Sequence, residues 1–348
     1  MKAPFIWDQY SDQPYPIKDK IYKKNMRIKH FWDYFPLLLS NIIFFPLSIL
    51  LMPWYRGQKV SENNFYGMGV DLDKGEAQKG LIEELGVKHL LVRFPLWEID
   101  RIEEYVAFAK SFGKDKIILL NILQDREHIE NSMLLKKDIE TVFEKFSPFV
   151  SEYQIGNAIN RTKWGFFSMK EYLYWYQIIQ KIRDDNYPKL KLIGSSVIDF
   201  EYHYTIRTLF NFFSLKYDRF SSLLYVDRRG SPDNTQMGIF NTKNKISMLY
   251  TLTKLSPKTT SDIYITEVNW PLSNTAPYAP TSEVECVSES DYSSFMLRYL
   301  ETAKESGKIQ RVYWHQLIAP GYGLVDNREG KLRKTEAFEA FKNQVAKT

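Results

Sequence analysis

The chain has 348 residues, a formal net charge of +5, 44% hydrophobic residues and 16% aromatic residues. This length allows either two average domains or one large α/β barrel, and the hydrophobic content is ample for a buried core. A single cysteine, Cys286, excludes an intramolecular disulfide framework and a metal cluster held by thiolates.

The first 34 residues form a polar and basic N-terminal segment. Within it, residues 18–30 hold six Lys or Arg side chains against one Asp. A short basic run of this kind favours contact with an anionic lipid surface over the reading of a nucleic-acid sequence. We therefore expect a membrane, and no nucleic acid, as its partner.

An uncharged run of 21 residues follows, from Phe35 to Tyr55. Its length is close to the roughly 20 residues that a helix needs to cross a bilayer. Pro46 lies at its centre and is expected to kink or break a helix. Three interpretations stay open: a kinked membrane span, a broken helix that enters one leaflet, and the buried core helix of a soluble protein. We expect residues 35–56 to anchor the chain in a membrane.

The charges around this run predict its orientation. We expect no cleavable signal peptide, because a long polar stretch precedes the run and no small-residue cleavage site follows it. Lys and Arg are concentrated before the run, so the positive-inside rule keeps the N-terminus in the cytoplasm. If the run spans, the chain is a bacterial inner-membrane protein with its main domain on the periplasmic side.

Strand-like apolar runs alternate with amphipathic helical stretches over residues 63–345, which is the pattern of parallel βα units. The eight predicted strands cover residues 64–72, 89–97, 116–123, 151–159, 190–198, 220–229, 262–270 and 311–318. Clear helix candidates cover residues 74–86, 99–113, 169–185 and 290–307. Gly86 and Gly113 follow two of these helices, where a left-handed C-cap is expected. Eight units predict an α/β fold of the (β/α)8 TIM-barrel type. A doubly wound sheet is the rival, but no glycine-rich phosphate turn follows the first strand.

In such a barrel the active site lies at the C-terminal ends of the strands. The side chains expected there are Asp71, Arg93, Asn121, Asn157, Asn160, Asp199, Tyr225, Asp227, Arg228, Arg229, Glu267, Asn269, Trp270, Trp314, His315 and Gln316. The long loop at residues 274–290 follows the seventh strand and is expected to cover the site. The five histidines have no metal-ligand spacing, so we expect no metal site and no cofactor.

Short motifs at these strand ends resemble those of clan A glycoside hydrolases, (β/α)8 enzymes that retain anomeric configuration by means of two carboxylates. "YITEVNW" resembles the seventh-strand motif that carries the nucleophile, a role that falls on Glu267. "YQIGNAIN" resembles the fourth-strand motif in which Gly-Asn precedes the acid/base Glu. Asn157 matches that motif, but Ala158 stands where the acid is expected.

Three further positions extend the resemblance. "VRFPLW" resembles the second-strand arginine that supports the nucleophile, here Arg93. "VYWHQL" resembles the eighth-strand tryptophan platform, here Trp314. Tyr225 occupies the sixth-strand position where the family often places a Tyr or His against the nucleophile.

The alanine at position 158 matters because a retaining enzyme needs its two catalytic groups about 5 Å apart. General acid catalysis is typically worth about 100- to 10,000-fold. Another acid, namely Asp199, Glu201 or Asp227, could replace the missing one. Alternatively, the substrate needs little protonation, or the barrel only binds glycan. An engineered change of Glu to Ala would give the same sequence.

The run "YVDRRGSP" indicates the substrate class. Arg228 and Arg229 follow Asp227 at a strand end, and paired arginines suit bidentate recognition of a carboxylate or phosphate. We therefore expect an acidic sugar. Together with "GNAINRTKWG", this run resembles barrel proteins encoded among bacterial lipopolysaccharide genes. One of these is the glycosidase-like component of the membrane-associated hydrolase that removes Kdo, an acidic ketose of the inner core. That resemblance implies action on lipopolysaccharide core together with a second protein subunit.

The expected site combines catalytic and substrate-binding residues. Glu267 is the expected nucleophile or general base. Tyr225 is an alternative nucleophile, since Kdo carries a carboxylate on its anomeric carbon and sialidases meet that problem with a tyrosine. The substrate-binding residues are expected to be Arg93, Asn157, Asp227, Arg228, Arg229, Asn269, Trp270, Trp314, His315 and Gln316, with the two tryptophans stacking on sugar. A catalytically silent glycan-binding subunit and a glycosyltransferase or transglycosidase are the rival functions.

Overall fold

The computed structural model describes residues 1–58, 64–328 and 330–347. The residue at which the barrel was expected to begin, 63, lies outside the described residues.

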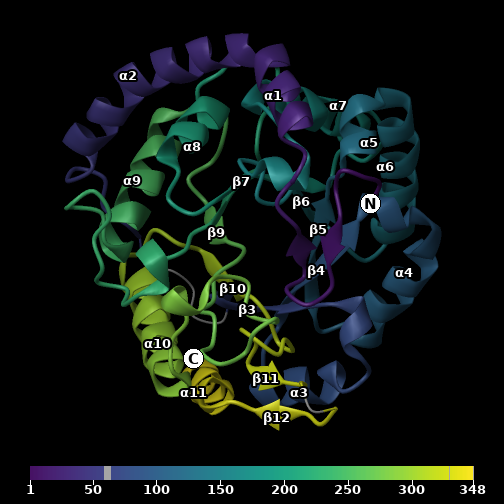
Figure 1. Ribbon diagram of the computed structural model, residues 1–348, viewed down its shortest axis with the longest axis vertical. Helices are drawn as coiled ribbons and strands as arrows, with labels where there is room; N and C mark the ends of the chain where they lie inside the picture. Colours follow the sequence, from purple (N-terminus) through teal and green to yellow (C-terminus); the bar gives the residue numbers. More distant parts are fainter. Residues whose placement is uncertain (59–63, 329, 348) are drawn as a thin grey trace.

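Eight parallel strands close into a barrel, which confirms the predicted TIM-barrel fold (Figure 1). In chain order they are β3 (Tyr66–Val70), β4 (His89–Pro95), β5 (Ile117–Leu123), β6 (Glu152–Ile155), β7 (Lys191–Ile198), β8 (Arg219–Leu223), β9 (Ile263–Ile265) and β10 (Arg311–Trp314). Each strand overlaps the apolar run that predicted it, and β10 pairs with β3 to close the barrel. The strands are apolar and buried almost throughout because both faces of a parallel sheet are covered.

Helices surround the barrel on the outside. They are α3 (Gln78–Leu85), α4 (Ile102–Ser111), α5 (Arg126–Glu130), α6 (Ser132–Phe146), α7 (Met169–Asn186), α8 (Tyr202–Leu209), α9 (Thr242–Leu255), α10 (Glu289–Glu305) and α11 (Glu336–Ala346). The four predicted helices correspond to α3, α4, α7 and α10. Gly86 ends α3 at φ 70°, the left-handed cap that its position predicted. A small sheet of β11 (Val325–Asp326) and β12 (Arg333–Lys334) lies outside the barrel.

The register of the strands positions polar side chains inside the barrel. Arg93 on β4 pairs with Asn121 on β5, and Asn121 pairs with Gln154 on β6. Because side chains alternate along a strand, paired residues share a face of the sheet. All three residues are at most 6% exposed, so a buried polar layer lies at one level of the barrel.

The N-terminal segment adds a hairpin and two helices to the barrel. The hairpin pairs β1 (Trp7–Asp8) with β2 (Gln13–Pro14), and in Figure 1 it crosses in front of the barrel strands. The basic residues expected to face lipid lie on and beside α1 (Lys20–Lys29), which Asp19 caps. The apolar run forms α2 (Tyr34–Leu51).

Pro46 was expected to kink or break the helix, and the structure excludes the break because α2 is continuous through Pro46. Only 11% of its apolar stretch is buried, so it is not the core helix of a soluble protein either. By length and composition alone the stretch Phe31–Leu51 could cross a membrane. In the structure it lies along the outside of the barrel over α8 and α9.

Aromatic and polar contacts fasten the inner face of α2. Phe44 stacks on Phe210 with ring centroids 3.5 Å apart, and Asn41 donates a hydrogen bond to the backbone carbonyl of His203 at 3.0 Å. Just before the helix, Asp33 forms a 2.9 Å ion pair with Arg207 in which both side chains are 6% exposed. Asp33 also accepts a hydrogen bond from the first turn of α7.

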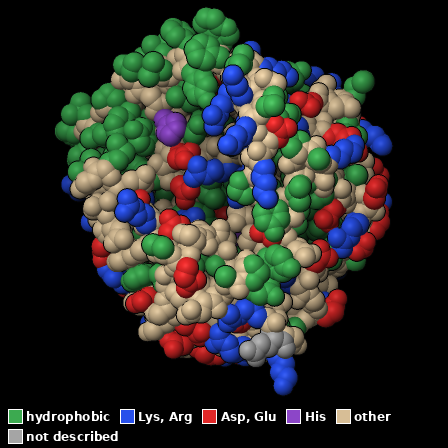
Figure 2. Space-filling model, in the orientation of Figure 1, with side chains coloured by type: hydrophobic (Ala, Val, Ile, Leu, Met, Phe, Trp, Pro, Cys, Tyr) green, Lys and Arg blue, Asp and Glu red, His purple; other side chains and the backbone are tan. Residues whose placement is uncertain are grey.

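The outer face of α2 forms an exposed apolar surface, which we call the α2 patch. It consists of Phe35, Leu38, Leu39, Ile42, Ile43 and Leu50, each between 49% and 67% exposed. Figure 2 shows hydrophobic side chains gathered over the region that α2 occupies, with Lys and Arg side chains beside them. A contiguous exposed apolar surface of this kind marks a site of contact with a protein partner or a membrane.

We predict that Asp33→Ala lowers the free energy of unfolding by about 3–5 kcal/mol, because it leaves Arg207 buried without its charge partner. The change is measured by urea unfolding in detergent. The control is Asp185→Ala, which removes an exposed ion pair with Lys181 on α7 and should cost less than about 1 kcal/mol. Equal costs for the two variants would contradict the fastening of α2 by this pair.

Candidate active site

Glu267 is the centre of a hydrogen-bonded cluster at the mouth of the barrel. It lies two residues after β9, and its side chain is 10% exposed. Its Oε1 accepts a hydrogen bond from the Tyr225 hydroxyl at 2.8 Å. Its Oε2 accepts one from Arg93 Nη2 at 2.5 Å and one from Asn157 Nδ2 at 3.4 Å. The structure thus brings together four residues that the sequence predicted for the site.

The Asn157 side chain is held in place from several directions. Its Oδ1 accepts a hydrogen bond from Asn121 Nδ2 at 3.1 Å. The Gln124 side chain bonds both the backbone N–H and the backbone carbonyl of Asn157, at 2.9 Å and 2.8 Å. The segment that carries Ala158 is therefore rigidly attached to the end of β5.

The cluster sets the protonation of its members. Burial opposes ionisation of Glu267, but the charge of Arg93 and the hydrogen bond from Tyr225 outweigh it and lower the pKa of Glu267 to about 2. Burial and the nearby Glu267 charge raise the pKa of Tyr225 well above its usual value. Tyr225 therefore donates its hydrogen bond to an ionised Glu267, and its role as an alternative nucleophile stays a prediction.

A small cavity of about 60 Å³ adjoins Glu267. Of the predicted residues, its lining includes Arg93, Tyr225, Arg229, Glu267, Asn269 and His315. Pro280 and Thr281 come from the loop that was expected to cover the site, and Ser11, Asp12 and Gln13 come from the N-terminal hairpin. Ligand cavities usually measure about 300–1,000 Å³, so a sugar ring cannot reach Glu267 while the hairpin lies there.

Ala158 is fully buried beside this cavity at φ 46°, a left-handed backbone conformation. Two of the acids proposed to replace the missing group, Asp199 and Glu201, each lie 2.5 Å from a nitrogen of Arg161 and are occupied by that ion pair. Lys163, which the motifs did not predict for the site, is only five residues after Ala158 in the chain. Burial and the positive charge of Arg161 lower the pKa of Lys163 to about 8, so its ammonium gives up a proton more readily than a surface lysine does.

His315 cannot serve as the missing acid near neutral pH. Burial and the positive charge of Arg93 lower the pKa of His315 to about 3, so its imidazole is neutral. The ring stacks on Tyr322. The neighbouring Asn269 donates a hydrogen bond to the backbone carbonyl of His315 at 2.7 Å. His315 and Asn269 both line the cavity beside Glu267.

The two tryptophans expected to stack on sugar do not face the cavity. Trp270 and Trp314 are fully buried and stack on each other with centroids 5.9 Å apart. Trp314 donates its indole N–H to Tyr292 on α10, and Trp270 donates to the carbonyl of Gly230. They belong to the packing between β10, α10 and the loop after β8, which is why no ring face is left for a substrate.

The arginine pair is also arranged differently from the expectation. Arg228 is exposed and Asp227 half-buried, and neither lines the cavity. Arg229 lines it, but its guanidinium lies 3.5 Å from the centre of the Tyr225 ring and 3.2 Å from Asp199. The Tyr225 ring covers one face of the guanidinium, and Asp199 occupies its Nη1, one donor of the fork that was expected to clamp an acidic substrate.

The sequence did not predict the groups that surround Asp12. The Asp12 Oδ2 atom lies 2.7 Å from Lys74 Nζ, 2.8 Å from Gln316 Nε2 and 2.9 Å from the Tyr322 hydroxyl. Gln316 was predicted for the site, whereas the other members were not. Asp12 and Tyr322 are more than 300 residues apart in the chain, and no periodicity or motif marks such a contact in advance.

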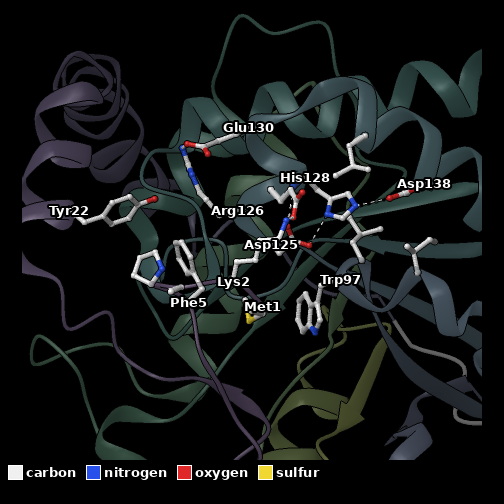
Figure 3. Close-up of a pocket in the computed structure, with 16 residues that line it drawn as sticks. Met1, Lys2, Phe5, Tyr22, Trp97, Asp125, Arg126, His128, Glu130 and Asp138 are labelled. Carbon is white, nitrogen blue, oxygen red and sulfur yellow. Dashed lines mark hydrogen bonds and ion pairs between the residues drawn. The ribbon is translucent and has the colours of Figure 1, made fainter.

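A second cavity of about 650 Å³ lies between the N-terminus and α5 (Figure 3). His128 there bonds Asp125 at 2.7 Å through Nδ1 and Asp138 at 2.9 Å through Nε2. Burial lowers the pKa of His128, but the two carboxylates outweigh it and raise the pKa. Both ring nitrogens are thus engaged, and this trio works as a buried ion-pair brace for α5 and α6. Among the described residues, no group of three His, Cys, Asp or Glu side chains is placed to hold a metal ion.

The barrel is structurally similar to solved glycoside hydrolases. The GH39 enzyme from Xanthomonas axonopodis pv. citri matches with a TM-score of 0.59 and 14% identity, over 84% of this chain and 68% of that enzyme. A monomeric β-xylosidase from Caulobacter crescentus matches with a TM-score of 0.57 and 14% identity, over 82% and 69%. The fold resembles that of clan A glycoside hydrolases.

The similarity extends to larger enzymes. A β-glucuronidase from Ruminococcus gnavus, solved with D-glucuronic acid, matches with a TM-score of 0.54 and 11% identity over 81% of this chain. The chain spans 49% of that enzyme's length. No protein-family model and no curated protein sequence matches this chain. At these identities the likeness establishes the fold, and the chemistry has to be argued from the site itself.

We predict a pH-dependent contribution of Glu267 to stability. Its pKa in the folded chain is about 2 and its ordinary value 4.5, so its contribution is fully present above pH 4.5 and is lost as the pH falls towards 2. The unfolding free energy of wild type minus that of Glu267→Gln should therefore shrink by at most about 3 kcal/mol between pH 5 and pH 2. Glu76→Gln, at a 91% exposed side chain, controls for the loss of a surface carboxylate. A difference that is constant with pH would contradict the charge pairing of Glu267.

Proposed function

We propose that the protein is a membrane-associated glycoside hydrolase that acts on an acidic glycan of the bacterial surface, with Glu267 as nucleophile or general base. The observation that carries this proposal is the arrangement of Glu267 at the mouth of a glycosidase-like barrel. An ionised carboxylate, bonded to Arg93, Tyr225 and Asn157, is held ready to attack an anomeric carbon or to activate a water.

The positive groups at the mouth support an anionic substrate. Arg93, Lys74 and Lys163 all lie beside the hairpin segment that fills the mouth. Cationic groups in a concave site raise the local concentration of anionic ligands. We infer that the substrate is Kdo in the lipopolysaccharide core, with a second protein subunit as partner.

Lys163 is our candidate for the general acid that protonates the oxygen of the leaving group. It would replace the glutamate that the motif expects at position 158. Its pKa of about 8 keeps it protonated at neutral pH, and a proton donor works best when its pKa is close to the working pH. It lies five residues after Ala158, in the short 3-10 helix Thr162–Trp164. Its present partner is Gln13 of the hairpin, at 2.6 Å, so departure of the hairpin releases it.

Ala158 favours one rival function, a catalytically silent subunit that presents glycan to a partner enzyme. A binding subunit would not need the Glu267 carboxylate to have both of its oxygens oriented by buried donors. The orientation of Glu267 therefore supports catalysis over binding alone. A transglycosidase would use Glu267 in the same way and is distinguished by analysis of the products formed with an acceptor sugar.

We predict that Glu267→Gln lowers the release of Kdo from purified lipopolysaccharide at least about 100-fold, because an uncharged amide cannot attack or take up a proton. Tyr225→Phe removes one hydrogen bond to the charged carboxylate and should lower release about 10-fold. Lys163→Met should slow release from lipopolysaccharide but not from an activated aryl ketoside, whose leaving group needs little protonation. Lys181→Met, at a 75% exposed side chain on α7, is the control. Wild-type release by Glu267→Gln would refute the proposed function.

The α2 patch supports attachment of the barrel to one leaflet. Because Asp33 and Asn41 fasten the helix to the outside of the barrel, we propose that α2 lies in the plane of the membrane and does not cross it. The apolar side chains of such a helix sink about 5–10 Å into the interface. The basic side chains of α1 then lie near the anionic headgroups.

We predict that the double variant Leu38→Glu with Ile42→Glu binds vesicles of anionic lipid at least about 10-fold more weakly than wild type. The two side chains are 58% and 63% exposed on the α2 patch, and burying each in lipid is worth about 1.5–3 kcal/mol. Co-sedimentation of the purified protein with vesicles measures this. Met133→Glu, at a 79% exposed position on α6, is the matched control, and equal binding by all three proteins would contradict the membrane contact.

A further inference from the structure

The N-terminal hairpin places a carboxylate directly beside the catalytic cluster. Asp12 lies at the turn between β1 and β2 with φ 49°, a left-handed conformation that Asp adopts more readily than most non-glycine residues. Its backbone carbonyl accepts a hydrogen bond from Arg93 Nη1 at 3.2 Å. The same guanidinium bonds Glu267 through Nη2. One arginine therefore separates the Asp12 turn from the Glu267 carboxylate.

Three donors converge on the Asp12 carboxylate, and we call them the cradle. Its members are Lys74, Gln316 and Tyr322, which approach one oxygen from the loop after β3 and from the segment after β10. Gln316 and Tyr322 are 2% and 1% exposed, and the Lys74 side chain is 13% exposed. A cation, an amide N–H and a hydroxyl around a single oxygen form a binding site for a carboxylate.

The hairpin itself is a small element. Its two strands pair over two residues each, and such short ribbons are marginal without other contacts. Trp7 packs against Trp97 and Trp164, and Gln13 bonds Lys163 and the carbonyl of Pro280. The turn is therefore fastened by side chains at the mouth, and these contacts can be exchanged for contacts with a ligand.

A sugar that reaches Glu267 must displace this turn, because the space left beside it measures about 60 Å³. Displacement would remove the charge partner of Lys74 and the carboxylate acceptor of Tyr322, and it would leave Gln316 Nε2 with the Tyr322 hydroxyl at 3.2 Å as an acceptor. Loss of these contacts at buried groups costs free energy. A second carboxylate restores both the hydrogen bonds and the charge partner of Lys74, whereas a neutral sugar restores only hydrogen bonds. Asp71 lies close by, and burial together with the Asp12 charge raises its pKa to about 6, so it opposes an incoming anion less than an ordinary aspartate would.

We propose that the cradle of Lys74, Gln316 and Tyr322 is the subsite that binds the carboxylate of an acidic sugar, and that Asp12 occupies this subsite in the resting protein as an internal competitor. This inference rests on the proposed function for the kind of substrate, but it assigns recognition of the acid to residues other than the arginine pair at positions 228 and 229. It also explains why the mouth is closed in the free chain.

The test measures competition in the wild-type chain and does not require turnover. Free Kdo is added to the purified full-length protein, and hydrogen exchange of the backbone amides at residues 7–17 is followed by mass spectrometry. Kdo at saturation should speed exchange of these amides at least about 10-fold, whereas the methyl ester of Kdo, which has the same ring without the charge, should leave exchange unchanged. Unchanged exchange with Kdo, or equal acceleration by the ester, would overturn the proposal.

Variants give an independent readout of the same subsite. Asp12→Ala should bind Kdo at least about 10-fold more tightly than wild type, because the competitor is gone. Adding Lys74→Met to it should abolish that gain. Asp8→Ala removes another hairpin carboxylate, one that bonds Tyr10 and Ser11 within the turn, and controls for loosening of the hairpin. A gain that survives Lys74→Met, or that Asp8→Ala matches, would contradict the assignment of the cradle.

The outcomes separate this inference from the proposed function. If Kdo displaces the hairpin but Glu267→Gln still releases sugar at the wild-type rate, the subsite stands and the catalytic proposal falls. If release depends on Glu267 while Kdo leaves the hairpin in place, the catalytic proposal stands and the subsite falls.

Discussion

The ion pair between Arg93 and Glu267 is the constraint on which the rest of the site depends. The two residues are 174 positions apart and meet only because β4 and β9 belong to one closed barrel. A buried charge without its partner is strongly destabilising, so the barrel has to bring them together with their other donors in place. Tyr225 and Asn157 complete the coordination of Glu267, and Asn121 and Gln124 in turn hold Asn157. The barrel therefore holds the Glu267 carboxylate ionised and oriented at its mouth.

Much of this arrangement could be predicted from the sequence because its causes are local. Strands buried on both faces read as continuous apolar runs, and helices between them read as amphipathic ones, so all eight strands were found. Parallel strands then send their C-terminal residues to one end, which places Glu267, Arg93, Tyr225 and Asn157 near one another before any contact is known.

The rest depends on contacts between distant parts of the chain. Trp314 was expected at the surface of the site, but Tyr292 of α10 offers its indole a hydrogen-bond partner inside the wall. Pro46 was expected to interrupt a helix, but packing against α8 and α9 keeps α2 continuous. The hairpin carries no periodic pattern, and its role follows from the match between Asp12 and three donors that come from other loops. Side-chain partners of this kind are set by the finished fold and cannot be inferred from spacing.

The N-terminal segment connects the two surfaces that matter for the proposed function. Its first part fills the mouth of the barrel, and its second part presents basic side chains and the α2 patch on the outside (Figures 1 and 2). Because α2 is fastened to the barrel through Asp33, the mouth keeps a fixed relation to any membrane that the patch contacts. The substrate that we propose, an acidic sugar of the lipopolysaccharide core, lies close to a lipid surface.

We propose that the ionised Glu267 removes an acidic sugar from a surface glycan. This can be measured by mass spectrometry of lipopolysaccharide from cells that carry either the wild-type chain or Glu267→Gln, expressed to equal levels. The core from the variant cells should retain one acidic sugar that the wild-type cells remove. Cores of identical mass in the two strains would contradict it.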